Sequence, residues 1–433
     1  RRRLPPGTNQ VQDGENMIKT VAHVIHRRGR RVDDPGIDIP VADDLVSQPG
    51  SRSKNVDVSF YSRVEPLTTP DLEKAADMDW AWTIFPDDLA EYRRAHDERS
   101  KPHLRAAETS GDIEPTGIPD PGVDMTEVIR NKARELGFGE VGFTMYDNRY
   151  TYAHRKGWPK FQNAICLALE QDYQQTQTIP SLEGEYAHFG TYEIEAEIAI
   201  ELAEHIRSLG YRAQMHLDSA EAGAFIPMFV NAGLGQLGAN GQLLSPHFGS
   251  RSRLAMLTTD APVTYDQPVD FGISNFCQEC QVCVNRCPGR ALIRDKVWYR
   301  GVQKNKVIYE RCRPVMANYD GCGICMKVCP IQKYGMKPVM EHYVETGGIL
   351  GKGTDNLEGY TLRDKGYQGP DKLPHFNTQF FDIPNCRPEE LLFNQFKEKV
   401  QAATMPPVEE MREFATEVKK ALERGKRQSH MKD

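Results

Sequence analysis

Eight of the ten cysteines fall into two closely spaced runs, and this spacing constrains the fold more than any other feature of the chain. The first run is Cys277-x2-Cys280-x2-Cys283-x3-Cys287-Pro288, and the second is Cys312-x9-Cys322-x2-Cys325-x3-Cys329-Pro330. A doubled pattern of this kind is typical of bacterial proteins with iron–sulfur clusters. The proline after the fourth cysteine suits the first position of a helix, where its missing N–H leaves no donor unpaired.

The fourth cysteine of each run is expected to bind the cluster of the other run, as in two-cluster ferredoxins. The predicted ligands of one [4Fe–4S] cluster are Cys277, Cys280, Cys283 and Cys329, and those of the second are Cys312, Cys322, Cys325 and Cys287. Zinc and disulfide bonds are the alternatives. Zinc sites use four ligands in total, often in paired C-x2-C units, and the doubled run fits that arrangement poorly.

The composition indicates a soluble globular protein. The 433 residues are 39% hydrophobic and 27% charged, which leaves room for two or three domains. Cysteine is abundant only within the two runs, so a secreted disulfide framework is not expected; Cys166 is predicted to be buried in a strand, and Cys386 is a loop thiol without an assigned partner. No run approaches the length of a membrane-spanning helix. The net charge of −7 argues against a nucleic-acid partner.

The amino-terminal stretch begins Arg1-Arg2-Arg3 and lacks the apolar segment of a signal peptide. An arginine pair can belong to a twin-arginine export signal, but the stretch that should follow it is absent here. A basic tail, or an amino terminus that has been trimmed, is therefore the preferred interpretation. A cytoplasmic location is favoured, and an exported or membrane-associated form stays open.

Changes in composition divide the chain into four expected regions. Residues 1–121 have little periodicity and end in a proline-rich linker, residues 122–270 alternate between helix and strand patterns, residues 271–335 carry the clusters, and residues 336–433 complete the core and the access to it. The predicted helices of the second region are Met125–Leu136, Tyr192–Leu209 and Ala224–Ala232, and its predicted strands are Val141–Met145, Ala164–Leu169, Tyr211–Leu217 and Leu254–Thr259. A charged helix is also expected over Val408–Arg424.

A glycine-rich stretch, Gly233-Leu234-Gly235-Gln236-Leu237-Gly238, matches the pattern G-x-G-x-x-G. The pattern alone is weak, and its context is wrong for a dinucleotide, because it follows a helix rather than a strand. Glycines allow a tight backbone that a large flat ligand can approach closely. A plain loop would use them equally well, so both interpretations stay open.

Ala232–Gln236, Ser245–Leu254, Pro268–Ile273 and the two cysteine runs follow one another in an order that resembles the corrinoid-dependent reductive dehalogenases. The wider family includes the epoxyqueuosine reductases of tRNA modification. The resemblance covers roughly residues 125–335. It implies an α/β (α+β) fold with a nitroreductase-like corrinoid-binding core and a ferredoxin-like segment. The residues expected to contact the corrinoid are Gly233, Leu234, Gly235, Gln236, Gly238, Ser245, Pro246 and Phe248.

The implied cofactor is a base-off cobalamin. The chain lacks the Asp-x-His-x-x-Gly pattern with which other corrinoid proteins supply a histidine to cobalt. A family member would leave the lower cobalt face without a protein ligand, which favours a reduced, nucleophilic cobalt. Two clusters that each carry single electrons suit this chemistry, because replacing carbon–halogen by carbon–hydrogen needs two electrons and a proton.

The resemblance also implies a proton donor. In the dehalogenases a tyrosine stands ahead of a helix that ends in Ile-Arg-x-x-Gly-Tyr, and the matching frame here, Ile206–Tyr211, puts Tyr192 at that position. A phenol is a poor acid near neutrality unless its anion is stabilised. The matching cation is Arg253, with Arg251 in reserve on the same face of the strand. A third polar contribution is expected near Asp218 or Ser219.

The predicted function is therefore reductive dehalogenation of a small organohalide, with electrons from a ferredoxin, flavodoxin or membrane partner. An epoxyqueuosine reductase is the nearest alternative, and it would need a carboxylate in place of Tyr192 and a basic surface for tRNA. An iron–sulfur or corrinoid electron-transfer subunit without substrate chemistry is another alternative. Two groups of aromatic residues are expected to line a pocket or to pack in the core: Trp80, Trp82 and Phe85, and Tyr150 and Trp158.

Overall fold

The structure is a computed structural model that describes residues 87–380, apart from gaps at 152–154, 156, 219–221, 293, 295–296, 300–301, 306, 308 and 378–379. Several expectations lie outside these residues, namely those for Trp80, Trp82, Phe85, Ser219, Cys386 and the helix over Val408–Arg424. Within the described ranges, no helix combines the length and the apolar character needed to cross a membrane.

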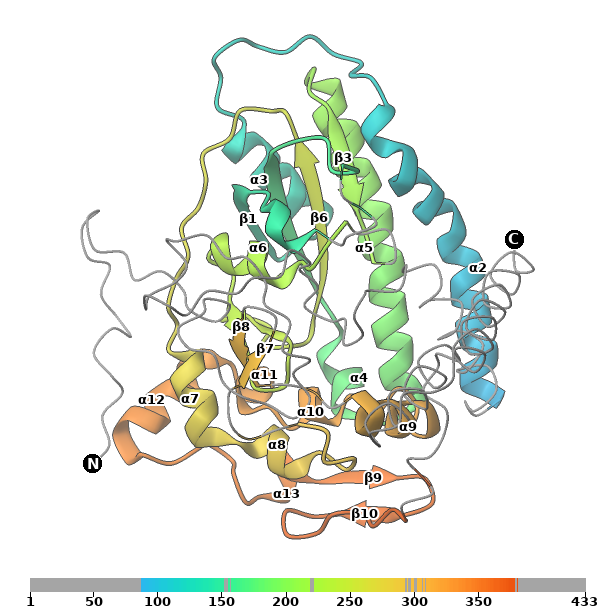
Figure 1. Ribbon diagram of the computed structural model, residues 1–433, viewed down its shortest axis with the longest axis vertical. Helices are drawn as coiled ribbons and strands as arrows, with labels where there is room; N and C mark the ends of the chain where they lie inside the picture. The colour runs from blue at the N-terminus through green and yellow to red at the C-terminus, as the bar shows by residue number, and fades with distance from the viewer. Residues whose placement is uncertain are drawn as a thin grey trace, which may run out of the picture.

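A four-stranded antiparallel sheet lies at the centre of the upper part of Figure 1. In spatial order its strands are β1 (Glu140–Met145), β2 (Asn163–Glu170), β6 (Ser252–Thr259) and β3 (Ala213–His216). The four predicted strands are confirmed to within two residues at each end. Every pairing is antiparallel, so the alternation of helices and strands along the chain produces an α+β fold rather than a parallel sheet.

Both faces of this sheet are buried, because successive side chains of a strand point to opposite sides. In β2, Ile165 and Leu167 belong to one hydrophobic core, and Cys166 belongs to the other. Cys166 is fully buried, which confirms its predicted place. Helices cover both faces of the sheet. The first face is covered by α3 (Thr126–Leu136) and α5 (Leu182–Ser208), and the second by α6 (Ile226–Asn231).

Helix α5 begins ten residues earlier than predicted, so Tyr192 lies inside the helix and not at its start. The helix starts at the N-cap Ser181, whose hydroxyl accepts a hydrogen bond from the backbone N–H of Gly184. The prediction followed the apolar stripe that includes Leu202 and Ile206. The first ten residues carry polar side chains along that stripe, and periodicity of apolar residues therefore does not reveal them.

Helix α2 (Asp87–Thr109) contradicts the expectation that the region before residue 121 lacks periodic structure. It runs beside α5 in Figure 1. The two helices meet through polar and aromatic contacts: Glu193 of α5 accepts from His96 and Arg99, and Tyr92 packs on Tyr186. Such contacts leave no apolar stripe in the sequence to predict the helix from.

The cluster segment, with the residues that follow it, fills the lower part of Figure 1. Its helices are α7 (Ile273–Cys280), α8 (Val282–Arg286), α9 (Tyr309–Asn318), α10 (Ile324–Lys327), α11 (Pro330–Tyr334), α12 (Met336–Thr346) and α13 (Asp355–Glu358), and its hairpins join β7 (Val297–Tyr299) to β8 (Val302–Lys304) and β9 (Tyr360–Leu362) to β10 (Gly366–Gln368). Cys277, Cys329, Val339 and Leu357 share one core, so residues beyond 335 pack on the cluster helices.

The two prolines that follow the cysteine runs behave differently. Pro330 begins α11, as predicted. Pro288 does not begin a helix: it enters a turn in which the N–H of Arg290 bonds to the carbonyl of Cys287. The adjacent Gly289 lies against the carbonyl of Arg311, where any Cβ would be only 2.5 Å from that oxygen. Close approach of α9 therefore replaces the expected helix by a turn.

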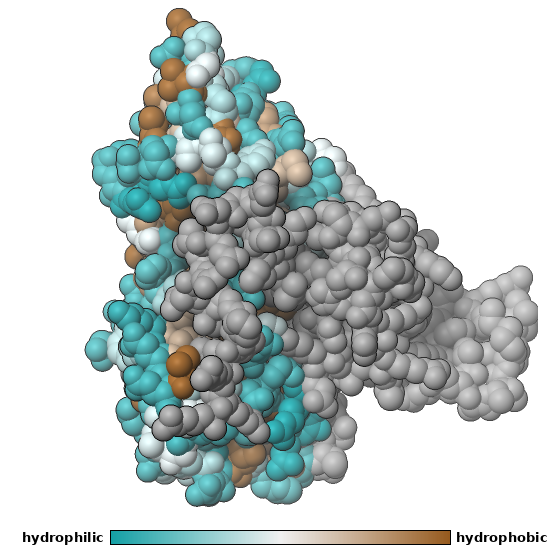
Figure 2. All heavy atoms as spheres, turned by 90° about the vertical axis from the view of Figure 1, so that its left-hand side faces the viewer, coloured by the Kyte–Doolittle hydropathy of each residue, from teal (hydrophilic) through white to brown (hydrophobic). Residues whose placement is uncertain are grey.

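The described surface is largely hydrophilic on the face that Figure 2 shows, and hydrophobic residues occur there in small patches. Isolated exposed apolar side chains of this kind are normal for a folded domain.

Candidate functional site

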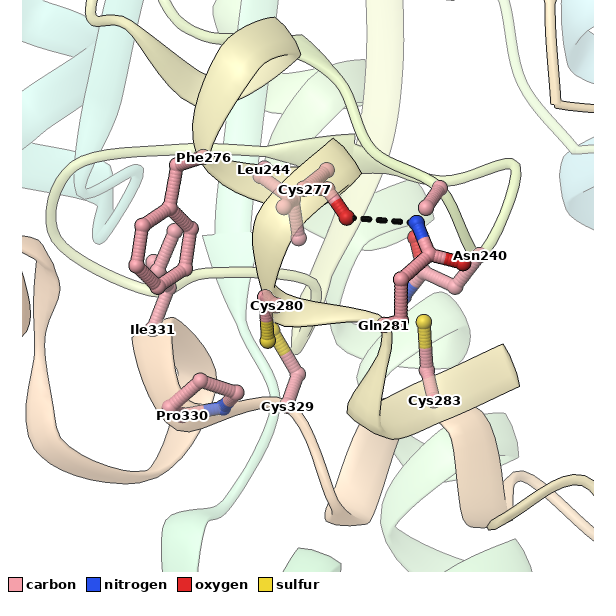
Figure 3. A pocket seen from close by; sticks show the side chains of 11 residues that line it. Asn240, Leu244, Phe276, Cys277, Cys280, Gln281, Cys283, Cys329, Pro330 and Ile331 are labelled. Carbon is pink, nitrogen blue, oxygen red and sulfur yellow. Dashed lines mark hydrogen bonds between the residues drawn. The ribbon is translucent and has the colours of Figure 1, made fainter. Parts of the chain in front are cut away.

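Four cysteines line one cavity in the cluster segment (Figure 3). Cys277 and Cys280 come from α7 and Cys283 from α8, while Cys329 comes from the residue just before α11. Cys287, the fourth cysteine of the first run, does not line this cavity. The four thiols therefore come from both sequence runs.

The wall of this cavity is apolar on one side and polar on the other. Phe276, Ile331 and Pro330 form the apolar side, and Asn240 and Gln281 form the polar side (Figure 3). The Gln281 side-chain amide donates to the carbonyl of Cys277 at 2.7 Å. The cavity is thus closed partly by the loop that follows the glycine-rich stretch, which contributes Asn240, and partly by the cluster helices.

A second group of thiols forms around Cys322 and Cys325. Burial raises the pKa of the Cys325 thiol, and the charges of Cys312 and Cys287 raise this pKa further. The pKa of Cys322 is likewise raised by burial and by Cys312, Cys325 and Cys287. These four thiols are near enough to one another to interact, and they again combine residues of both runs.

The donor sets fit iron–sulfur clusters. None of the nine cysteines that the structure describes is in a disulfide. Across the described residues, no three His, Cys, Asp or Glu side chains converge as ligands of a single ion. The first thiol group lines a cavity, and both groups contain only the sulfur ligands that such clusters prefer.

The glycines of the G-x-G-x-x-G stretch pack against the protein itself. A Cβ on Gly235 would lie 2.4 Å from the carbonyl oxygen of Leu244, and one on Gly233 would lie 2.5 Å from that of Gln267. Gly238 is similarly tight against the Leu244 side chain. Their small size is thus explained by internal packing, and a ligand is not needed to account for it.

Gln236 joins the glycine-rich stretch to the cluster segment. Its side-chain oxygen accepts from the backbone N–H groups of Phe271, at 2.8 Å, and Ile273, at 3.3 Å, which positions the start of α7. Its amide nitrogen is buried and has no hydrogen-bond partner in the described part of the chain. The same holds for the Ser250 hydroxyl and the Gln332 amide. These groups retain hydrogen-bonding capacity for a polar cofactor, and in this respect they fit a corrinoid with its rim of amides.

The remaining residues expected to contact the corrinoid lie in the same region. Ser245 accepts from the backbone N–H of Phe248 at 2.9 Å. The Phe248 ring packs on Gly139, where a Cβ would be 2.4 Å from the ring. Leu234 and Pro246 are partly exposed beside them. The structure brings these residues together at the lower end of the sheet.

Tyr192 and Arg253 lie against each other, as the resemblance implies. The guanidinium of Arg253 in β6 is 5.4 Å from the centre of the Tyr192 ring in α5. Its Nε also donates to the side chain of Gln171 at 3.1 Å. Burial raises the pKa of Tyr192, as does the negative charge of Asp218, whereas Arg253 lowers it. The phenol therefore stays protonated at neutral pH, and Arg253 opposes the effect of burial only in part.

Arg251 makes its contacts elsewhere. Its guanidinium pairs with Glu170 at 2.6 Å, donates to the carbonyl of Gln332 at 2.7 Å, and lies 5.1 Å from the centre of the Tyr173 ring. These contacts fasten the start of β6 to α11. The structure therefore brings Arg253, and not Arg251, to Tyr192.

Three titratable residues near Tyr192 were not singled out from the sequence. Glu185, His188 and Glu195 share with Tyr192 a stripe of α5 at intervals of three and four residues. Burial raises the pKa of Glu195 well above its usual value, and one carboxyl oxygen is buried without a partner among the described residues. The spacing of these residues would have revealed the stripe, had the helix been predicted to begin at residue 182.

The chain is similar in sequence to reductive dehalogenases. It is 28% identical over 269 residues to the tetrachloroethene reductive dehalogenase of Desulfitobacterium hafniense, a match that covers 48% of each chain. It is also 35% identical over 146 residues to the epoxyqueuosine reductase of Lactococcus garvieae, covering 31% of this chain and 39% of that one. No protein-family model matches the chain.

Solved structures give the same result for the fold. The catabolic reductive dehalogenase NpRdhA superposes with a TM-score of 0.55 at 25% identity, covering 63% of this chain and 42% of the other. A second reductive dehalogenase, described in connection with B12-dependent dehalogenation, superposes with a TM-score of 0.53 at 24% identity, covering 65% and 46%. The chain spans about half the length of the relatives that it matches. In sequence and in fold the chain is therefore similar to the reductive dehalogenases.

Proposed function

We propose that the chain forms the catalytic part of a cobalamin-dependent reductive dehalogenase. The observation that carries the proposal is the contact between Tyr192 and Arg253. This contact lies at the end of the sheet that is next to the thiol-lined cavity. An electron-transfer subunit would account for the thiols and leave this phenol–guanidinium pair without a role. The substrate would be a small organohalide, and the electrons would come from a separate donor.

Two [4Fe–4S] clusters would be held by crossed ligation. Cys329 would join Cys277, Cys280 and Cys283, as the lining of the cavity supports, and Cys287 would join the second group. Paired substitutions distinguish crossed from uncrossed ligation. With crossed ligation, the Cys283→Ala, Cys329→Ala double variant loses about four irons, and the Cys283→Ala, Cys287→Ala double variant loses about eight. Iron analysis that shows the opposite order would contradict the crossed assignment.

The corrinoid would lie at the lower end of the sheet, held by the glycine-rich stretch and by Ser245, Pro246 and Phe248. The unpaired polar groups of Gln236, Ser250 and Gln332 are candidates for hydrogen bonds to its amides. When bound, a base-off cobalamin supplies the reduced cobalt centre that attacks carbon–halogen bonds. The protein's contribution is to orient the substrate and to control the proton.

Tyr192 would supply that proton. Two electrons and one proton convert the carbon–halogen bond into carbon–hydrogen and free halide, and the phenol of Tyr192 breaks its O–H bond in this step. Arg253 lies where it can stabilise the resulting phenolate. Asp218 opposes ionisation of the phenol. Its effect would be to keep Tyr192 protonated until the proton is transferred to the substrate carbon.

Epoxyqueuosine reduction is the alternative that the comparisons support less. The matching segment of the Lactococcus garvieae relative covers about a third of this chain. A carboxylate is expected at the donor position of that enzyme, whereas this chain has Tyr192. The nearest buried carboxyl belongs to Glu195. This residue lies one turn further along α5, on the same stripe as Tyr192.

The proposal is tested by halide release. The protein is reconstituted anaerobically with iron, sulfide and cobalamin, reduced with a low-potential reductant, and offered chlorinated ethenes and halogenated phenols. We expect halide and the hydrogenated product in equal amounts from at least one of these classes. Loaded protein that releases no halide from either class, and that reduces an epoxide instead, would contradict the proposal.

A further inference from the structure

Helix α5 carries a stripe of four titratable side chains that runs from the cluster segment to Tyr192 and beyond. They are Glu185, His188, Tyr192 and Glu195, and they follow the spacing that places residues on one face of a helix. Further along the same face the stripe becomes apolar, with Ala199, Leu202 and Ile206. A buried line of acids and bases next to a proposed proton donor needs a chemical explanation.

His188 is placed to exchange a proton with Tyr192. Its ring centre is 5.2 Å from that of Tyr192, one helical turn away. Its side chain is 31% exposed, so water reaches it. The stacked ring of Phe189, at 4.6 Å, restricts the orientation of the imidazole.

Glu185 is hydrogen-bonded to the Nδ1 atom of the His188 ring. Its carboxylate lies 2.9 Å from Nδ1, so the neutral ring carries its proton there and leaves Nε2 with a free electron pair. Glu185 itself packs against Gly321, next to the cysteine-bearing loop, where a Cβ would collide with its carboxyl oxygen. This geometry is that of a base with a fixed tautomer.

The charged groups that face His188 come from three elements. Burial lowers the pKa of His188, and Arg253 of β6 lowers it further, whereas Glu185 of α5 and Asp218 after β3 raise it. An imidazolium in this setting gives up its proton readily, because its neutral form is the favoured one at neutral pH. Such a group can transfer a proton but does not stay protonated at neutral pH.

We propose that His188 returns a proton to Tyr192 after each turnover, and that Glu185 positions the imidazole for this transfer. The inference rests on the proposed role of Tyr192 as the proton donor. After Tyr192 has given its proton to carbon, the neutral His188 ring accepts a proton from a hydronium ion of the solvent at Nε2. The imidazolium then breaks this Nε2–H bond as the phenolate re-forms its O–H bond, so His188 returns to its neutral form and one solvent proton enters for each carbon–halogen bond that is replaced.

The pairing with Glu185 is tested in protein without substrate. Nuclear magnetic resonance of the histidine side chains follows the titration of His188, which is identified by its loss in His188→Gln. We expect Glu185→Gln to lower the pKa of His188 below its value in the parent protein, because a charge that raises this pKa is removed. An unchanged titration would show that Glu185 is not the partner that positions the ring.

The relay is tested by comparing the first turnover with later ones. In His188→Gln, Tyr192 already holds its proton, so the first turnover keeps its rate, while steady-state turnover falls by about a hundredfold. Added imidazole should restore the steady state. The matched control is His96→Gln, which removes an imidazole bonded to Glu193 at 2.7 Å on the other side of α5 and should leave both rates unchanged.

The possible failures are distinguishable. If the parent protein releases no halide, the proposed function is wrong and the relay falls with it. If the parent protein is active and His188→Gln matches it at steady state, the relay alone is wrong. A His188→Gln variant whose first turnover slows as much as its steady state would also contradict resupply, because the histidine would then act in the chemical step.

Discussion

The sheet region and the cluster segment are built on different physical principles. The sheet is buried on both faces and is covered by α5, a helix of 27 residues. The cluster segment uses helices as short as α8 and α10, with 5 and 4 residues. Helices shorter than about 12 residues are marginal on their own. We therefore expect the sheet region to be stable on its own, and the cluster segment to depend on what its thiols bind.

The cluster segment and the sheet region also differ in backbone conformation. Asp320, Gly321, Cys322 and Gly323 are consecutive residues with positive φ, between 45° and 73°. Two of them are not glycine, and such a conformation is strained for a side chain. A bound cluster would offset this strain, because the binding free energy of a metal centre adds to the folding free energy. In the sheet region no described non-glycine residue of α5 or of the four strands has positive φ.

Removal of iron should produce the largest difference in stability between the two regions. We expect fast amide hydrogen exchange in α7, α8 and α10 once the iron is chelated, with protection retained in β2 and β6. Structural metal sites contribute on the order of 10 kcal/mol to folding, which is comparable to the whole stability of a typical domain. Exchange measured by mass spectrometry checks this. Equal loss of protection in both regions would show that the sheet does not fold independently.

Substitution of the proposed proton donor should affect chemistry without affecting either region's stability. Tyr192→Phe keeps the shape of the side chain and removes the acidic hydroxyl, so dehalogenation should fall by about 10²–10⁴-fold. The iron and cobalt contents should equal those of the parent protein. Arg253→Lys should be milder than Arg253→Met, which leaves the phenolate without a cation. An undiminished rate in Tyr192→Phe would rule out the phenol as the proton source.

A buried carboxyl is a polar exception within the sheet region. Burial raises the pKa of Glu140 to about 7, which the nearby Ser245 hydroxyl and the backbone N–H of His247 offset only in part. Its ordinary pKa is 4.5, so ionisation opposes folding increasingly as the pH rises from 4.5 to 7, and by a constant amount above that. Glu140→Gln should raise the free energy of unfolding by about 3 kcal/mol at pH 8 and change it little at pH 4.

Denaturant unfolding at the two pH values measures this difference. Exposed Glu127, which pairs with Arg130 on the surface of α3, provides the control, and Glu127→Gln should show no comparable pH dependence. A stabilisation by Glu140→Gln that is equal at both pH values would mean that the charge of Glu140 is not its cause.

The smallest expected effect concerns the start of α5. Ser181→Ala removes the hydroxyl that accepts from Gly184 at 3.1 Å and should lower the free energy of unfolding by about 1 kcal/mol. Ser208→Ala, at the other end of the helix, is the control, because that hydroxyl bonds only to the carbonyl of His205 on the surface. Equal effects of the two substitutions would argue against a specific N-cap.

The strands and the thiol groups were predictable because their signals are local. Apolar runs such as Ala164–Leu169 define β2, and the spacing of the cysteines indicates which thiols gather. The contact between Tyr192 and Arg253 was predictable only through the resemblance to a family, since these residues are far apart in the sequence. No periodicity joins α5 to β6.

The missed features depend on contacts between distant segments. Helix α2 is held by His96, Arg99 and Tyr92 against α5, and none of these contacts appears as a pattern within α2 itself. The turn at Pro288 results from the approach of α9, which sequence rules for an isolated proline do not include. The internal packing of Gly233 and Gly235 similarly requires knowledge of their neighbours.

The central claim is that two thiol groups and the lower end of the sheet hold two clusters and a corrinoid. Metal analysis with an ultraviolet–visible spectrum of anaerobically reconstituted protein tests this most directly. We expect about eight irons and about one cobalt per chain, with the broad absorption of [4Fe–4S] clusters and the bands of base-off cobalamin. Zinc in place of iron, or full iron without any corrinoid, would contradict the account.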